Sequence, residues 1–121
     1  MAKILLAEDD QSMMHFLIIA LERAGHSIDA RENGLQAIEA LKENAGYDLL
    51  LTDIVMPGMD GIELAQKATA IQPDIKVMFI TGFAAMAVKA DKGNTPDASQ
   101  VLSKPFHLND LVQQVEDLLA A

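Results

Sequence analysis

Four short runs of consecutive apolar residues alternate along this chain with longer stretches of helical periodicity. The runs cover residues 4–7, 49–51, 77–80 and 101–102, and a weaker strand is expected at 27–31. Strands that are apolar at consecutive positions are typical of a parallel sheet covered on both faces. The alternation therefore predicts one α/β domain, residues 1–121, in which a parallel sheet lies between helices.

Capping and stop residues place the helices between these strands. Helices are predicted from Gln11 to Ala24, from Asn33-Gly34 to near Gly46, from Asp60 to Pro73 and from Leu108 to about Ala120. Gly25 supplies a C-terminal stop for the first helix, and Asp60 followed by Glu63 has the form of a capping box. Between Phe83 and Asp97 the pattern is weak and predicts one short, mobile helix. The result is five strands and five helices, with no room for a second domain.

Charge and composition narrow the range of functions. The formal net charge of -9 argues against nucleic acid or an anionic membrane surface as a partner. The absence of cysteine excludes disulfides, thiolate catalysis and cysteine-ligated metal sites. The first apolar run is too short for a signal peptide or a membrane span, so a soluble cytoplasmic protein is expected.

Polar side chains follow the predicted strands at their carboxyl ends. They are Glu8, Asp9, Asp53, Thr81 and Lys104. In open α/β sheets, ligands bind beyond these strand ends, so we expect the five side chains to converge on one small site. Each residue taken singly has an ordinary structural explanation, and it is their coincidence that predicts a site.

The chemistry of this set favours metal-assisted phosphoryl transfer. Clustered carboxylates repel one another unless a proton or a cation intervenes, and all-oxygen ligands favour Mg2+, for which manganese could substitute. Lys104 would neutralise an incoming phosphoryl group, and the Thr81 hydroxyl could donate a hydrogen bond to it. Asp53 is then left as the nucleophile, because carboxylates form acyl phosphates.

Four motifs together resemble the receiver domain of bacterial two-component response regulators. They are ILLAEDD at 4–10, Asp53 with MPGMDG at 56–61, ITG at 80–82 and KPF at 104–106. The resemblance covers essentially the full length of the chain. It implies a flavodoxin-like (βα)5 fold, a doubly wound parallel sheet with the strand order 2-1-3-4-5.

The resemblance also implies a role for each site residue. Asp53 would be the phosphoacceptor, Asp9 a direct Mg2+ ligand, Glu8 an outer-sphere ligand through water and Val55 a ligand through its backbone carbonyl. A cis peptide bond would precede Pro105. The phosphodonor would be a histidine kinase or a histidine phosphotransfer protein, and phosphorylation would change the affinity for an output protein. The chain would be no enzyme beyond self-catalysed phosphotransfer and dephosphorylation.

For a stand-alone receiver, the expected output is protein binding. Residues 101–108 resemble a protease-adaptor type within the family, and the terminal Leu118-Leu119-Ala120-Ala121 is similar to tails recognised by bacterial unfoldases, or is simply a helix that ends. A phosphorelay intermediate and a flagellar-motor ligand are the alternatives within the family. Val101 stands where many relatives carry a switching aromatic residue, so we expect activation to reorder residues 83–97 instead.

Three other classes compete with this interpretation. A Mg2+-dependent small phosphatase would share the aspartate nucleophile, but Val55 stands where haloacid-dehalogenase-type enzymes carry a second aspartate. A flavin carrier of similar fold is disfavoured because Glu8, Asp9 and Asp10 would repel the flavin phosphate. A phosphorylation-independent binding module would keep the fold with an inert site.

Overall fold

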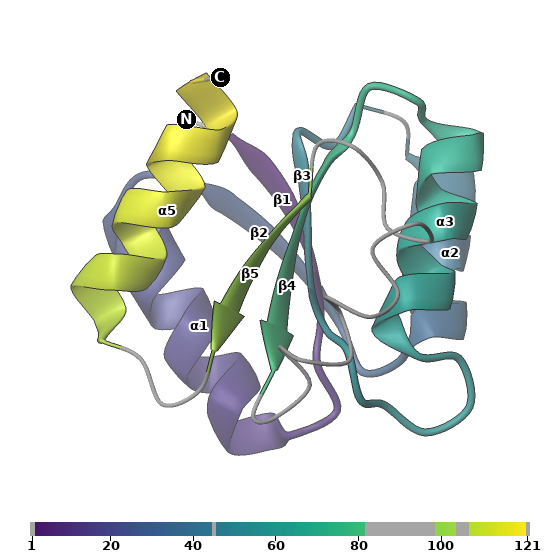
Figure 1. Cartoon of the computed structure of the whole chain (residues 1–121), viewed down its shortest axis with the longest axis horizontal. Helices are drawn as coiled ribbons and strands as arrows, with labels where there is room; N and C mark the ends of the chain where they lie inside the picture. Colours follow the sequence, from purple (N-terminus) through teal and green to yellow (C-terminus); the bar gives the residue numbers. More distant parts are fainter. Residues whose placement is uncertain (1, 45, 82–98, 104–106, 121) are drawn as a thin grey trace.

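Five parallel strands form one sheet in the order β2-β1-β3-β4-β5 (Figure 1). The computed structural model describes residues 2–44, 46–81, 99–103 and 107–120, and for Thr81 and the fifth strand it describes the backbone alone. The strands are β1 (Lys3–Ala7), β2 (Ser27–Arg31), β3 (Leu49–Asp53), β4 (Lys76–Thr81) and β5 (Ser99–Ser103). The predicted α/β class and strand order are confirmed.

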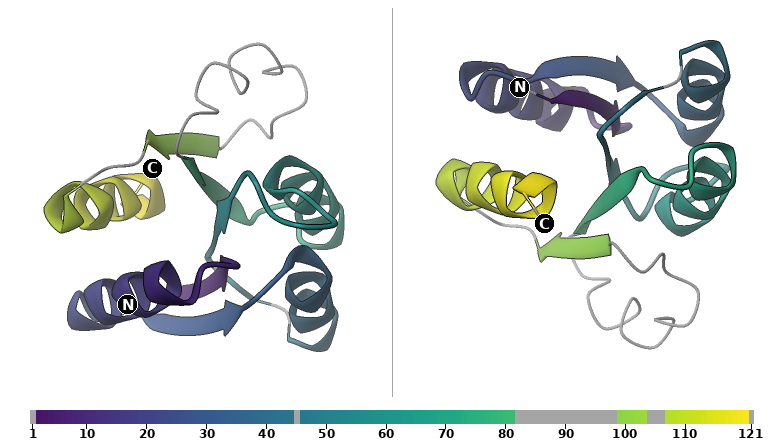
Figure 2. Two further views of the ribbon diagram at one scale, coloured as in Figure 1. Left: turned by 90° about the horizontal axis from the view of Figure 1, so that it is seen from below. Right: turned by 90° about the horizontal axis from the view of Figure 1, so that it is seen from above.

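Two layers of helices enclose this sheet. The described part of the chain contains α1 (Gln11–Arg23), α2 (Gly34–Glu43), α3 (Gly61–Ile71) and α5 (Leu108–Ala120), close to the predicted bounds. Figure 2 shows α1 and α5 on one face of the sheet and α2 and α3 on the other. The short helix predicted between Phe83 and Asp97 lies outside the described residues. Within the described ranges, no helix is both long enough and apolar enough to cross a membrane.

The central strand β3 explains the consecutive apolar residues of the sequence. All five of its residues are buried. Because side chains alternate across a strand, Leu50 packs in the hydrophobic cluster beneath α2 and α3, while Leu49 and Leu51 pack in the cluster beneath α1 and α5. Both faces of the strand therefore need apolar residues, and polar groups are displaced to its ends.

Side-chain caps fix the starts of three helices. In each case a carboxylate or amide oxygen of the residue before the helix accepts a hydrogen bond from a backbone N–H of the first turn. The acceptors are Asp10 for α1, Asn33 for α2 and Asp60 for α3. The Asp60 oxygen lies 2.8 Å from the Glu63 nitrogen, as the capping-box pattern predicts. The loops that follow β1, β2 and β3 at the carboxyl edge of the sheet therefore end at these three capping residues.

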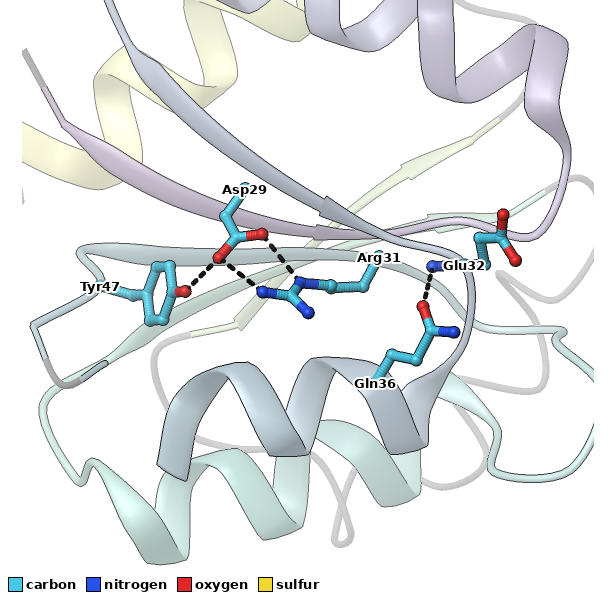
Figure 3. Close-up of polar contacts among 5 residues, drawn as sticks. All are labelled: Asp29, Arg31, Glu32, Gln36 and Tyr47. Atoms are coloured by element: carbon cyan, nitrogen blue, oxygen red, sulfur yellow. Dashed lines mark hydrogen bonds and ion pairs between the residues drawn. The ribbon is translucent and has the colours of Figure 1, made fainter. Parts of the chain in front are cut away.

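A polar network ties the edge strand β2 to the segment that precedes β3 (Figure 3). The Asp29 carboxylate accepts hydrogen bonds from the Arg31 guanidinium, at 2.8 Å from Nε, and from the Tyr47 hydroxyl. The Arg31 hydrogen bond holds the pKa of Asp29 below its ordinary value, against the opposing effect of burial. Burial, followed by the hydrogen bond to Asp29, raises the pKa of Tyr47. The network thus places paired charges on an edge strand, where they also discourage pairing with another chain.

Replacing Asp29 with Asn should give a pH-dependent loss of stability. Because the pKa of Asp29 is lowered on folding, its charge stabilises the fold above the unfolded-state pKa, and this contribution disappears as the pH falls through the lower folded-state value. We expect Asp29→Asn to lower the free energy of unfolding by about 1 kcal/mol at pH 7. The difference in the free energy of unfolding between the variant and the wild type should shrink below pH 3.8, the ordinary pKa of this carboxyl group.

Urea unfolding of the wild type and the variant between pH 7 and pH 3 measures this difference. Asp74→Asn, at an exposed aspartate outside the network, is the matched control. A difference that stays constant across this range would contradict a role for the Asp29 charge.

Candidate functional site

Three carboxylates meet at the carboxyl ends of β1 and β3. Glu8, Asp9 and Asp53 each place one oxygen so that all three oxygens lie within 4.8 Å of one another. Glu8 and Asp53 are buried, with 1% and 7% of their surface exposed, whereas Asp9 is exposed. The structure therefore brings together three of the residues that the sequence pointed to, with two of the charges held out of water.

Backbone pairing holds the ends of these strands in register. Glu8 directly follows β1, and its N–H donates to the carbonyl of Arg31 at the end of β2, at 3.1 Å. Asp53 is the last residue of β3 and pairs with Ile80 of β4, whose carbonyl accepts the N–H of Ile54 at 3.1 Å. Since all the strands are parallel, their carboxyl ends lie at one edge of the sheet, and the acids are gathered there.

Asp10 has a different task from its two acidic neighbours. Its Oδ1 accepts hydrogen bonds from the N–H groups of Ser12 and Met13, at 2.9 and 3.1 Å. Its own N–H donates to Glu8 Oε2 at 3.3 Å. Of the three consecutive acids, two therefore face the site, and the third caps α1 while its backbone helps to orient Glu8.

The backbone around Asp53 is held by two residues that sequence reasoning did not identify. The buried hydroxyl of Thr52 donates to the Asp53 carbonyl at 2.9 Å. At Gly61, a Cβ atom would lie 2.1 Å from the same carbonyl oxygen, so the first turn of α3 packs directly on the end of β3. The Gly61 N–H also donates to the Ile54 carbonyl at 2.8 Å. The glycine directly after the Asp60 cap was the available sequence signal for this close approach.

The loop after Asp53 bends back onto its side chain. The Val55 N–H donates to Asp53 Oδ1 at 3.2 Å, and the Val55 side chain is exposed. This hydrogen bond orients one of the two oxygens of the Asp53 carboxylate. The role of the Val55 carbonyl as a metal ligand stays a prediction.

Thr81 and Lys104 are the other two predicted site residues. Thr81 ends β4 and pairs in register with Ser103, the last residue of β5. The backbone of Thr81 therefore reaches the same edge of the sheet as Asp53. The Thr81 side chain, Lys104 and the predicted cis bond before Pro105 lie outside what the structure describes.

The donor set of the three carboxylates fits a hard divalent cation. All three side chains offer oxygen, which Mg2+ prefers and manganese also accepts. Holding the buried Glu8 and Asp53 as anions side by side is costly unless positive charge or hydrogen bonds compensate. Glu8, Asp9 and Asp53 would therefore be the residues that hold Mg2+.

The sequence of the chain matches a known protein family. Residues 4–116 match the family model described as "Response regulator receiver domain". The response regulator receiver protein CpdR of Brucella abortus is 57% identical over 121 residues, which cover 100% of this chain and 99% of that protein. In several other curated relatives the match is to a smaller part, between 12% and 51% of the protein.

Solved structures agree with this match. A response regulator receiver protein from Sinorhizobium medicae is 35% identical, with a TM-score of 0.90 and coverage of 99% of this chain and 95% of that one. The response regulator TrrA of Thermotoga maritima, solved in complex with Mg2+ and BeF, is 29% identical, with a TM-score of 0.83 and coverage of 98% and 99%.

Adding a side chain at position 61 should disturb the site through the backbone of Asp53. We expect Gly61→Ala to lower the free energy of unfolding by about 1–3 kcal/mol, because the new Cβ overlaps the Asp53 carbonyl oxygen. Displacement of Asp53 should also weaken Mg2+ binding, which isothermal titration calorimetry measures.

Gly46→Ala is the matched control, since Gly46 has φ of +98° and an added Cβ would meet nothing within 4 Å. Backbone strain should lower the free energy of unfolding of this variant by about 1–2 kcal/mol. Its Mg2+ affinity should equal that of the wild type. Equal Mg2+ affinities in the two variants would show that the packing of Gly61 does not position Asp53.

Proposed function

The chain belongs to the response regulator receiver family, and we propose that it is a single-domain cytoplasmic switch, residues 1–121, that is phosphorylated on Asp53. The observation that carries this proposal is the clustering of Glu8, Asp9 and Asp53 at one edge of the sheet. A histidine kinase or a histidine phosphotransfer protein supplies the phosphoryl group. The modified domain then changes its affinity for an output protein.

The proposed reaction is a transfer between two side chains. An oxygen of the Asp53 carboxylate attacks the phosphorus of the donor phosphohistidine, and a P–O bond forms as the P–N bond breaks. The electron pair of the broken bond stays on the imidazole nitrogen, which takes up one proton.

Asp9 and Asp53 would bind Mg2+ directly, Glu8 through water and Val55 through its carbonyl. When bound, Mg2+ supplies positive charge that offsets the carboxylates and the phosphoryl oxygens. The solved structure of TrrA with Mg2+ and BeF supports the same cation for this chain. Lys104 would neutralise a phosphoryl oxygen, and Thr81 would donate a hydrogen bond to another.

An apolar strip on α1 suits the docking of the phosphodonor. Phe16 and Ile19 are 43% and 50% exposed, one helical turn apart. Ile19 also lines a hollow of about 450 Å3 that Leu108 and Val112 of α5 border. Because α1 begins directly after the acidic residues, a helix seated along this strip could bring its histidine towards Asp53.

Incubation with acetyl phosphate and Mg2+ tests the proposed acceptor. We expect intact-mass spectrometry to show one phosphoryl adduct on the wild type, because Asp53 is the carboxylate that ends β3 beside the other two acids. The adduct should be absent from Asp53→Asn and from samples that contain EDTA. Hydroxylamine should remove it, as it cleaves acyl phosphates.

Asp74→Asn is the control, because Asp74 is an exposed aspartate away from the three carboxylates. It should accept the phosphoryl group as the wild type does. A wild type without any adduct, or an adduct that persists in Asp53→Asn, would contradict the proposal. The first result would favour a binding module with an inert site.

For the output, we propose an ATP-dependent bacterial unfoldase, for which the chain would act as a phosphorylation-controlled adaptor. The resemblance of residues 101–108 to protease-adaptor receivers supports this. The terminal residues support it less, because Leu118 is 5% exposed and its carbonyl accepts a hydrogen bond from Lys76 Nζ at 2.7 Å. Leu118 therefore serves the packing of α5, and a partner would meet the folded surface before it met the tail.

Binding to a purified bacterial unfoldase in both phosphorylation states tests the adaptor role. Since phosphorylation adds charge at one edge of the sheet, we expect the dissociation constants of the two states to differ by about 5- to 150-fold. Asp53→Asn should bind like the unphosphorylated wild type with or without acetyl phosphate. Equal binding, or none, in both states would contradict the adaptor role and leave the phosphorelay and motor-ligand alternatives.

A further inference from the structure

A hollow of about 660 Å3 opens beside the site, among the loops that follow β1, β2 and β3. We call it the loop groove. Its lining includes Asp9, Glu32, Leu35, Pro57 and Met59. Hollows of this size accommodate a small molecule or a few side chains of a partner. The phosphoryl transfer proposed above uses Asp9 alone among these residues.

Part of the lining of the loop groove is apolar. Leu35, in the first turn of α2, is 65% exposed, more than Phe16, Ile19 or Ile71. Beside it, Met59 packs so closely on Gly34 that a Cβ there would lie 2.9 Å from the Met59 sulfur. An exposed leucine contributes little to the core, and a neighbouring methionine adapts readily to the shape of a partner. This part of the lining is therefore suited to receiving an apolar side chain.

Two other residues of the lining are acidic. Glu32 and Asp9 are both exposed, and the Gln11 amide donates to Glu32 Oε1 at 3.3 Å. Figure 3 shows the Glu32 carboxylate pointing away from Gln36, whose side chain instead accepts the Glu32 N–H. Among the residues that the structure describes, no lysine or arginine forms an ion pair with either acid. The groove thus offers negative charge next to apolar side chains.

From this combination we infer that the loop groove binds a basic, apolar segment of a protein partner. A leucine, methionine or phenylalanine of the segment packs against Leu35 and Met59, and a flanking arginine or lysine pairs with Glu32. Nucleic acid and anionic membranes do not fit, because the groove is acidic and the chain carries a net charge of -9. An acidic segment would be repelled by the same charges. The inference adds a docking surface that needs no phosphoryl group on Asp53.

Titration of the 15N-labelled full chain with three capped hexapeptides tests the inference by NMR. One peptide alternates arginine and leucine, the second glutamate and leucine, and the third arginine and serine. The first should shift the backbone amide signals of Asn33, Leu35 and Met59, and the other two should leave them in place. Equal shifts with either of the other peptides, or shifts centred on another surface, would overturn the inference. The titration contains EDTA and no phosphodonor, so its outcome is independent of whether Asp53 accepts a phosphoryl group.

Two surface variants with matched controls locate the binding. Leu35→Ser should weaken binding of the arginine–leucine peptide about tenfold, because the apolar contact is lost. Glu32→Gln should weaken it about two- to fivefold, the effect of an exposed ion pair. Ile71→Ser and Glu22→Gln make the same chemical changes at exposed positions outside the groove and should bind like the wild type. Unchanged binding by Leu35→Ser, or equal weakening by the controls, would overturn the inference.

Discussion

The burial of β3 on both faces is the constraint from which the rest of the molecule follows. Every residue of this strand is enclosed, so Leu49, Leu50 and Leu51 must be apolar in succession, and a helix layer must cover each face. A parallel sheet of this kind brings all its carboxyl ends to one edge. Asp53 is placed at the end of the strand, where the chain leaves the core. The site therefore lies at the carboxyl edge of the sheet.

Placing acids at that edge has an electrostatic consequence. Glu8 and Asp53 are nearly as buried as the core residues around them, and Asp9 is next to both. Their mutual repulsion is relieved by a cation, by hydrogen bonds or by protonation. A divalent cation held by these three carboxylates would relieve the repulsion without consuming a proton.

Much of this arrangement could be predicted from the sequence, because its signals are local. Each signal determines the structure within a few residues of its own position. These signals are the apolar runs, the caps at Asp60 and Asn33, and the acids after β1 and β3. The separate task of Asp10 could not be predicted, since a run of three acids does not reveal which side chain turns back onto the helix. The close packing of Gly61 on Asp53 and the contact between Tyr47 and Asp29 depend on segments that meet only in the folded chain.

Asp9 connects the site and the loop groove, because it belongs to the three carboxylates and also lines the hollow beside them. A cation bound at the site would draw on the same negative charge that attracts a basic segment into the groove. Met59 makes a second connection, since it lies in the loop that leaves Asp53 and packs on Gly34 at the start of α2. If both the site and the loop groove are occupied through Asp9, binding at one would change the affinity of the other, and by linkage this effect would be reciprocal.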